Sequence, residues 1–208
     1  MPGEGANGSR AGYETARLEL ARLRLAGDDA RAAAMRQITQ TSARALGLER
    51  VGIWAFKGTG GRLRGVCQFE LSTGSFPAKG LPDGLDLPIL LAELSQRRVV
   101  AIAEARKDRR TSEIAGYLAL YGIESLMAVP VIRDGNVVGA ISCEQVGSVR
   151  IWSQADRDFG ACAADMAALF LEQADKLDIQ ARELIEMDLL PAQRRTHATL
   201  SALKHTFH

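Results

Sequence analysis

Two nearly continuous apolar runs dominate the pattern of hydrophobic and polar positions, one over residues 126–132 and the other over residues 137–143. Between them lie Asp134, Gly135 and Asn136, which supply a position that accepts positive φ and the short polar side chains of a tight reversal. The two runs therefore predict a β-hairpin. Because neither run alternates apolar with polar residues, both faces of the hairpin should be covered, which places it at the centre of a sheet.

The residues before the hairpin predict a mixture of helices and strands. Helices are expected over residues 13–27, 30–46, 88–96 and 112–121. Strands are expected over residues 51–56, 63–71 and 99–103. Gly47 ends the second helix, and the apolar stripe of that helix consists of Met35, Ile38, Ser42 and Leu46. The Gly- and Pro-rich residues 72–87 are predicted to form a loop.

The last long element is an amphipathic helix predicted over residues 153–190, with Ser153 as its N-cap and Asp156 in its first turn. Its apolar seam has members four and three residues apart, as in a coiled coil. The residues assigned to a dimer interface are Phe159, Ala163, Met166, Phe170, Leu177 and Leu184. Such a helix would be about 57 Å long, more than a domain of this size can cover. Its second half is expected to pack against a second copy, or else to bend back or fray after Glu172.

Composition and charge narrow the range of partners. The chain has 208 residues, of which 47% are hydrophobic and 25% charged, as is ordinary for one or two globular domains. Because 26 Lys and Arg nearly balance 25 Asp and Glu, there is no electrostatic reason to expect nucleic acid or an anionic membrane as a partner. No apolar run is long enough to cross a bilayer and no signal-peptide pattern is present, so a cytoplasmic location is expected.

Candidate catalytic groups are scarce. All three histidines, His197, His205 and His208, lie near the end of the chain, away from the region predicted to fold. The three cysteines, Cys67, Cys143 and Cys162, lie in apolar contexts without metal-ligand spacing. We therefore expect no enzyme activity, no cofactor and no metal site.

Glu144 is the one carboxylate that directly follows an apolar central strand, and it must find a partner or reach solvent. We expect it to order the loop that holds Arg150 and Trp152 through a salt bridge, with contact to a ligand as the alternative.

Several motifs, taken in order, resemble those of a GAF domain, in particular the GAF domains that precede bacterial sensor histidine kinases. Residues 49–54 resemble the opening strand of the family, and residues 108–113 resemble its Asp-Pro-Arg-Thr-x-Glu turn. The second half of the domain is matched by Tyr117, Gly122, residues 125–130, Gly135, Gly139, Glu144, Gly147, Arg150, Trp152, Asp156 and Phe159. The resemblance implies an α+β fold with a central antiparallel sheet of about five to six strands flanked by helices and a long C-terminal signalling-type helix.

The resemblance also sets the expected domain boundaries. They are a disordered leader over residues 1–12, an N-terminal helix over 13–29, the GAF domain over 30–172, a dimerising helix extension over 173–190 and a polar basic tail over 191–208.

GAF domains of this kind typically hold a small ligand between one face of the sheet and the helices and loops that cross it. By position, the candidate lining comprises Trp54, Phe69, Phe76, Leu90, Tyr117, Tyr121, Met127, Cys143 and Glu144, although strand alternation allows only about half of them to face one side. The kinase-associated pattern has Asp at the position of Ala128 and His at that of Gln145, so a polar pair on neighbouring strands would be absent here.

These features favour a non-enzymatic sensor that binds an unidentified small molecule, forms a homodimer and acts on a histidine kinase or another signalling protein. The first alternative is a ligand-free dimerisation or interaction module with a filled core. The second is a redox enzyme of the methionine-sulfoxide-reductase type, which uses cysteines in mid-domain loops, whereas those of this chain fall on predicted strands and a helix. Attachment of a bilin requires a suitably placed cysteine and a polar cradle, which the sequence lacks.

Overall fold

A six-stranded antiparallel sheet, in the order β3-β2-β1-β6-β5-β4, forms the centre of the fold. The computed structural model describes residues 10–24, 29–57, 62–77 and 83–170, all within one compact unit. The strands are β1 (Arg50–Lys57), β2 (Arg62–Glu70), β3 (Asp83–Asp86), β4 (Val100–Ile102), β5 (Ile123–Arg133) and β6 (Asn136–Val146). The predicted sheet of about five to six strands is thereby confirmed.

The hairpin predicted from the two apolar runs is formed by β5 and β6. Arg133 pairs with Asn136, and the two residues between them, Asp134 and Gly135, have φ values of 50° and 77°. Two consecutive residues with positive φ match the right-handed twist of the flanking strands, which explains the Asp-Gly sequence at this turn. Because β6 lies between β1 and β5, the hairpin is interior to the sheet, as predicted.

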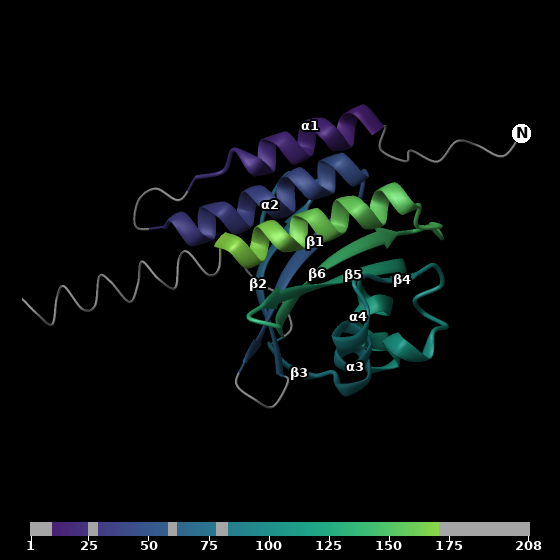
Figure 1. The fold of residues 1–208 in the computed structure, drawn as a ribbon. Helices are drawn as coiled ribbons and strands as arrows, with labels where there is room; N and C mark the ends of the chain where they lie inside the picture. The colour runs from purple at the N-terminus through teal and green to yellow at the C-terminus, as the bar shows by residue number, and fades with distance from the viewer. Residues whose placement is uncertain (1–9, 25–28, 58–61, 78–82, 171–208) are drawn as a thin grey trace, which may run out of the picture. The chain divides into compact units, whose positions relative to one another are not determined.

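One face of the sheet is covered by α2 (Ala30–Leu46) and by the helix over residues 154–170 (Figure 1). The predicted stripe of α2 is confirmed, because Met35, Ile38, Ser42 and Leu46 are all buried. The helix ends at Gly47, whose φ of 62° lets the Leu48 amide bond back to the Ala43 carbonyl. The side chain of Asp29, at the N-cap position of α2, forms an ion pair with Arg36 and makes no capping hydrogen bond to the helix.

The first helix, α1 (Arg10–Ala21), packs on the outer side of α2 (Figure 1). It begins three residues before the predicted start, so the last three residues of the predicted leader are helical, and it ends before residue 27. Tyr13 and Leu20 are 3% and 0% exposed, and these buried anchors explain why the helix forms where it does.

The opposite face is covered by α3 (Pro88–Gln96), the 3-10 helix η1 (Arg109–Ile114) and α4 (Ala115–Leu120) (Figure 1). The predicted helix over residues 112–121 is therefore divided between η1 and α4. The predicted loop over residues 72–87 contains β3, which pairs with β2 at the edge of the sheet. This short edge strand contains Gly84, which weakens the local strand signal, so the sequence pattern does not reveal it.

The start of the C-terminal helix agrees with its predicted cap. The Asp156 amide donates to Ser153 Oγ (3.1 Å), and the Ser153 amide donates to Asp156 Oδ2 (2.8 Å), so the two residues cap each other. The structure describes this helix as far as Phe170. The predicted extension over residues 173–190, the basic tail over 191–208 and residues 1–9 of the predicted leader lie outside the described residues.

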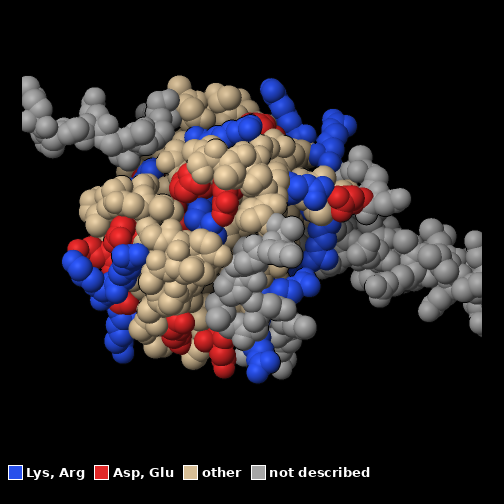
Figure 2. Space-filling model, turned by 180° about the vertical axis from the view of Figure 1, so that it is seen from behind, with Lys and Arg blue, Asp and Glu red and all other residues tan. Residues whose placement is uncertain are grey.

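The described surface agrees with the balanced composition. On the face shown in Figure 2, acidic and basic side chains are interspersed. Among the described residues, no helix combines the length and apolar character needed to cross a membrane.

Candidate functional site

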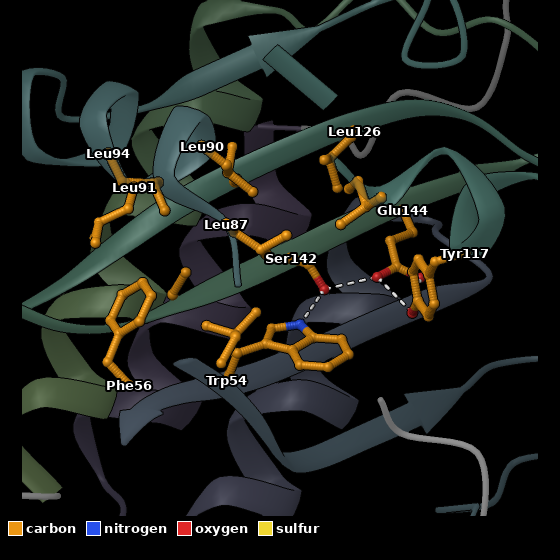
Figure 3. Close-up of a pocket in the computed structure, with 14 residues that line it drawn as sticks. Trp54, Phe56, Leu87, Leu90, Leu91, Leu94, Tyr117, Leu126, Ser142 and Glu144 are labelled. Carbon is orange, nitrogen blue, oxygen red and sulfur yellow. Dashed lines mark hydrogen bonds between the residues drawn. The ribbon is translucent and has the colours of Figure 1, made fainter. Parts of the chain in front are cut away.

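A cavity of about 50 Å³ lies between the sheet and α3 (Figure 3). The sheet contributes Trp54, Phe56, Leu63, Leu126, Ala128, Ala140, Ser142 and Glu144, and the covering elements contribute Leu87, Leu90, Leu91, Leu94, Ile114 and Tyr117. The lining residues of β6 alternate along the strand, at positions 140, 142 and 144, as required for side chains on one face. Almost all of the exposed wall is hydrocarbon.

The helix that covers the cavity is held by the motif over residues 108–113. Both carboxylate oxygens of Glu113 accept bonds from the first free amides of α3, at Ile89 (2.9 Å) and Leu90 (3.2 Å). Asp108 caps η1 by accepting from the Arg110 amide, and the buried Thr111 hydroxyl donates to the Ala105 carbonyl. The motif therefore fixes the leucines of α3 over the cavity.

One end of the cavity is closed by a hydrogen-bonded polar network (Figure 3). Trp54 Nε1 donates to Ser142 Oγ (2.8 Å), and Ser142 Oγ donates to Glu144 Oε1 (2.7 Å). The Tyr117 hydroxyl lies 3.0 Å and 3.1 Å from the two oxygens of Glu144. Gly52 makes room for this arrangement, because a β-carbon there would lie 3.0 Å from both Ser142 Oγ and Trp54 Nε1.

Arg50 supplies the positive charge of the network. Its Nε donates to Glu144 Oε2 (3.1 Å), another nitrogen pairs with Glu70, and its guanidinium lies 3.9 Å from the centre of the Tyr121 ring. The side chains of Arg50 and Glu144 are 6% and 1% exposed. Burial raises the pKa of Glu144 above its ordinary value, although the charge of Arg50 and the bonds from Ser142 and Tyr117 act in the opposite direction.

Burial, followed by the charge of Glu144, also raises the pKa of the Tyr117 hydroxyl, so this group remains a proton donor at neutral pH. Glu144 receives a further donor in Gln68 Nε2 at 3.4 Å. Each charged or polar group at this end of the cavity thus has partners within the protein, as a buried polar group requires.

The structure brings some of the predicted lining residues together and separates the others. Trp54, Leu90, Tyr117 and Glu144 line the cavity. The ring of Tyr121 lies tilted against that of Tyr117, with the ring centres 4.9 Å apart, and flanks the network. Four others do not line it: Met127 and Cys143 pair with each other on the helix-covered face, and Phe69 packs against Phe76 at 5.1 Å. The separation follows from alternation, since Cys143 and Glu144 are neighbours on one strand.

On β1 and β6, the residues of the site that the sequence did not predict lie at the same alternating positions as Trp54 and Glu144. Ser142 and Ala140 precede Glu144 by two and four residues, and Arg50 and Phe56 lie four before and two after Trp54. Counting by two from Trp54 and Glu144 is the signal that could have found them. The predicted loss of a polar pair at Ala128 and Gln145 is wrong, because Ala128 pairs with Ser142 while Gln145 pairs with Ser125 on the other face.

The predicted role of Glu144 in ordering the loop of Arg150 is also wrong. Glu144 pairs with Arg50, and the loop is held by a second network in which Arg150 Nη2 bonds to Asp156 Oδ1 (2.9 Å) and Nη1 to the Leu46 carbonyl (2.8 Å). The Tyr13 hydroxyl donates to the same Asp156 oxygen at 2.5 Å. Burial opposes ionisation of Asp156, but the bonds from Tyr13 and Ser153 and the charge of Arg150 hold its pKa below the ordinary value.

The predicted dimer residues occupy two kinds of position. Phe159, Ala163 and Phe170 are buried within a single chain, at 0%, 1% and 3% exposure, so they offer no surface to a second chain. Met166 is half-buried. Leu177 and Leu184 lie outside the described residues.

None of the three cysteines lines the cavity. Cys143 is fully buried on the opposite face, while Cys67 on β2 and Cys162 on the C-terminal helix are half-buried. Burial raises the pKa of all three thiols, which disfavours the reactive thiolate. Among the described residues, no group of His, Cys, Asp and Glu side chains is arranged to hold a metal ion.

Comparison with known proteins identifies the family of this fold. The sequence profile described as "GAF domain" matches residues 31–171. The chain belongs to the GAF family. The matched residues include both the cavity and the polar network. No curated protein sequence matches the chain.

Solved structures with the same fold include several photoreceptor domains. JSC1_58120g3 in its far-red absorbing dark state, with bound biliverdin IXa, is 16% identical, with a TM-score of 0.63, and the match covers 79% of this chain and 99% of that one. The blue-light absorbing PixJ GAF domain of Thermosynechococcus elongatus is 18% identical, with a TM-score of 0.62 and coverage of 75% and 93%. Bacteriophytochrome RpBphP3 from R. palustris is 16% identical, with a TM-score of 0.67 and coverage of 87% and 42%.

Proposed function

We propose that this GAF domain is a non-enzymatic, cytoplasmic sensor that binds a small molecule in the cavity and transmits its occupancy through a helical homodimer. The observation that carries the proposal is the location of the cavity on one face of β5 and β6, whose other face supports the C-terminal helix. The output would be a histidine kinase or another signalling protein that contacts the helices.

The two strands offer a short route from the cavity to the helix. Leu126 and Ala128 line the cavity, while Met127 between them faces the helical layer. Gly160 of the C-terminal helix lies directly on Met127, because a β-carbon at residue 160 would come within 2.8 Å of Met127 Cε. A displacement of β5 on ligand binding would therefore change the packing of the C-terminal helix against Met127. A ligand shifts such an equilibrium only by its difference in affinity for the two packings.

The proposed dimer depends on the second half of the predicted helix. Since Phe159, Ala163 and Phe170 are already buried, the seam available to a second copy is the one predicted around Leu177 and Leu184. We expect light scattering after size exclusion to give a dimer for the natural protein and a monomer for Leu177→Asp. Leu120→Asp is the matched control, because Leu120 is 75% exposed on α4, across the sheet from the helices. A dimeric Leu177→Asp protein would refute this interface.

The bilin bound by the photoreceptor relative is not the ligand we propose. The cavity of about 50 Å³ is well below the roughly 300–1,000 Å³ of ordinary ligand pockets, and no thiol lines it. We expect the chain, co-expressed with a biliverdin-producing system, to be purified without a visible absorption band. A stable band above 500 nm, on the order of one chromophore per chain, would contradict this choice of ligand class.

The enzyme alternative is testable by counting thiols. A methionine-sulfoxide-reductase mechanism needs a cysteine that reacts as a thiolate and a second one that resolves it, whereas burial disfavours ionisation of all three thiols here. We expect titration of the denatured protein to give the same thiol count before and after exposure to dilute peroxide. Loss of a pair of thiols, restored by reductant, would favour the enzyme.

The small size of the cavity favours a second candidate, a ligand-free interaction module. Native mass spectrometry of freshly purified protein tests the sensor against the interaction module. A dimer with a discrete added mass supports the sensor. Bare dimers that also fail to bind any small probe in the cavity would favour the interaction module.

A further inference from the structure

We infer that the cavity is a dry site for a compact, uncharged molecule without hydrogen-bonding groups, and that Ala128 and Ala140 set the size of that molecule. This inference rests on the proposed sensor function and assigns the chemical class of its ligand. The polar residues at the end of the cavity would at first suggest a site that recognises a polar group, and the inference differs from that expectation.

The polar atoms at the cavity end are already engaged with one another. Trp54 Nε1 is bonded to Ser142 Oγ, whose own proton is donated to Glu144. Glu144 accepts from Tyr117 and Arg50 in addition. The donors of Trp54, Ser142 and Tyr117 are all used, so a ligand acceptor would have to break one of these bonds, leaving a buried group unpaired at a cost of about 1–3 kcal/mol. A ligand donor finds almost no polar surface exposed in the cavity. The network therefore closes the site against polar ligands.

The rest of the wall is hydrocarbon. Leu90 and Leu94 of α3 are 7% and 3% exposed, and they line the cavity together with Leu126 and Ala128 of β5. A buried water needs about two to four polar partners, which this wall does not offer, so the site favours apolar molecules over water. An apolar ligand therefore has no tightly held water to displace when it binds.

The volume limits the size of the occupant. A water molecule needs roughly 10–15 Å³ on this scale, and a dry cavity of about 150 Å³ accepts benzene or xenon. The present cavity of about 50 Å³ thus exceeds one water and is smaller than a benzene site. Molecules of the matching class are apolar gases and the shortest hydrocarbons.

Two alanines on the sheet create this space. Ala128 and Ala140 are 3% and 5% exposed, both line the cavity, and the cross-strand neighbour of Ala128 is Ser142, another small residue. A valine at either position would project two additional methyl groups into the cavity. In close-packed interiors, a change of even one methylene group is felt, so either valine would exclude the ligand.

The test follows methyl resonances of the full chain during titration with xenon and cyclopropane. We expect saturable shifts of the Ala128, Ala140 and Leu126 methyl groups in the natural protein, and a dissociation constant at least about tenfold higher in Ala128→Val. Ala101→Val is the matched control, because Ala101 pairs with Met127 on the other face of the sheet. This variant should bind xenon and cyclopropane with the same affinity as the natural protein. Ala140→Val replaces Ala128→Val should the latter fail to fold.

The polar probes 1-propanol and propylamine separate the inference from the proposed function. Shifts of the cavity methyl groups with a polar probe but not with xenon or cyclopropane would overturn the apolar class and leave the sensor in place. Equal affinity for xenon in the natural protein and both valine variants would place binding elsewhere and overturn the inference. If no probe of either class shifts these methyl groups, both proposals are overturned and the ligand-free module is favoured.

Discussion

Replacement of Arg50 by Met should destabilise the protein in a way that depends on pH. Arg50 is 6% exposed and is the cation paired with Glu144, which is 1% exposed, so the variant leaves a buried carboxylate without its counter-charge. Breaking a buried pair from one side costs about 3–5 kcal/mol. We expect about 3 kcal/mol at pH 7, the lower end of that range, because Ser142 and Tyr117 still donate to Glu144.

The direction of the pH dependence follows from the pKa of Glu144. Burial raises this pKa above the ordinary value of 4.5, and loss of Arg50 raises it further. A carboxyl group whose pKa is higher in the folded than in the unfolded protein reduces stability as pH rises above its unfolded value. The deficit of Arg50→Met relative to the natural protein should therefore be smallest near pH 4.5 and largest at neutral pH.

The assay is unfolding in guanidinium chloride, followed by tryptophan fluorescence, at several pH values between about 4.5 and 7.5. In a parallel thermal unfolding experiment at neutral pH, the melting temperature of the variant should lie roughly 6–12 °C below that of the natural protein, as about 3 kcal/mol predicts for this chain length. Arg50→Met combined with Glu144→Met should recover part of the loss, since no charge is then left unpaired between these residues. An equal deficit at both ends of the pH range, or a double variant less stable than Arg50→Met, would refute the reasoning.

Three further predictions concern the supporting structure. Tyr13→Phe removes the hydroxyl that donates to Asp156 at the start of the C-terminal helix, and it should lower the free energy of unfolding by about 1–3 kcal/mol. Amide exchange in α1 should become faster, and unchanged exchange would contradict this role of Tyr13. Gly139→Ala should lower the melting temperature sharply, because a β-carbon at residue 139 would overlap the Trp54 carbonyl oxygen. Gly116→Ala is the control and should be neutral or stabilising, because the space around Gly116 is open. Similar melting temperatures for the two variants would be inconsistent with the close pairing of β6 with β1. Glu113→Gln should cost about 0.5–2 kcal/mol and speed amide exchange at the start of α3, and equal exchange would show that α3 is held by other contacts.

The elements that could be predicted from the sequence are those whose signals are local. The β5–β6 hairpin is marked by its apolar runs and by Asp134 and Gly135, and the end of α2 by Gly47. Strand β3 has no such signal, because its four residues contain a glycine and its stability comes from pairing with β2. Local patterns do not report a pairing of that kind.

The candidate site was predictable only in part. Trp54, Leu90, Tyr117 and Glu144 follow from their place in the predicted elements, and all four line the cavity. Arg50 could not be assigned to Glu144, because 94 residues separate them and their pairing depends on β1 lying beside β6. The pairing of strands distant in sequence is set by the whole fold, which one sequence does not specify in advance.

The most direct test of the sensor is amide hydrogen exchange over residues 160–170, with and without saturating cyclopropane, in the natural protein and in Ala128→Val. If occupancy of the cavity reaches the helical layer through β5, exchange in this helix should change by several-fold in the natural protein and remain constant in the variant. Cavity methyl groups that shift with cyclopropane, while exchange in the helix stays the same, would show a ligand site without transmission and would contradict the proposed function.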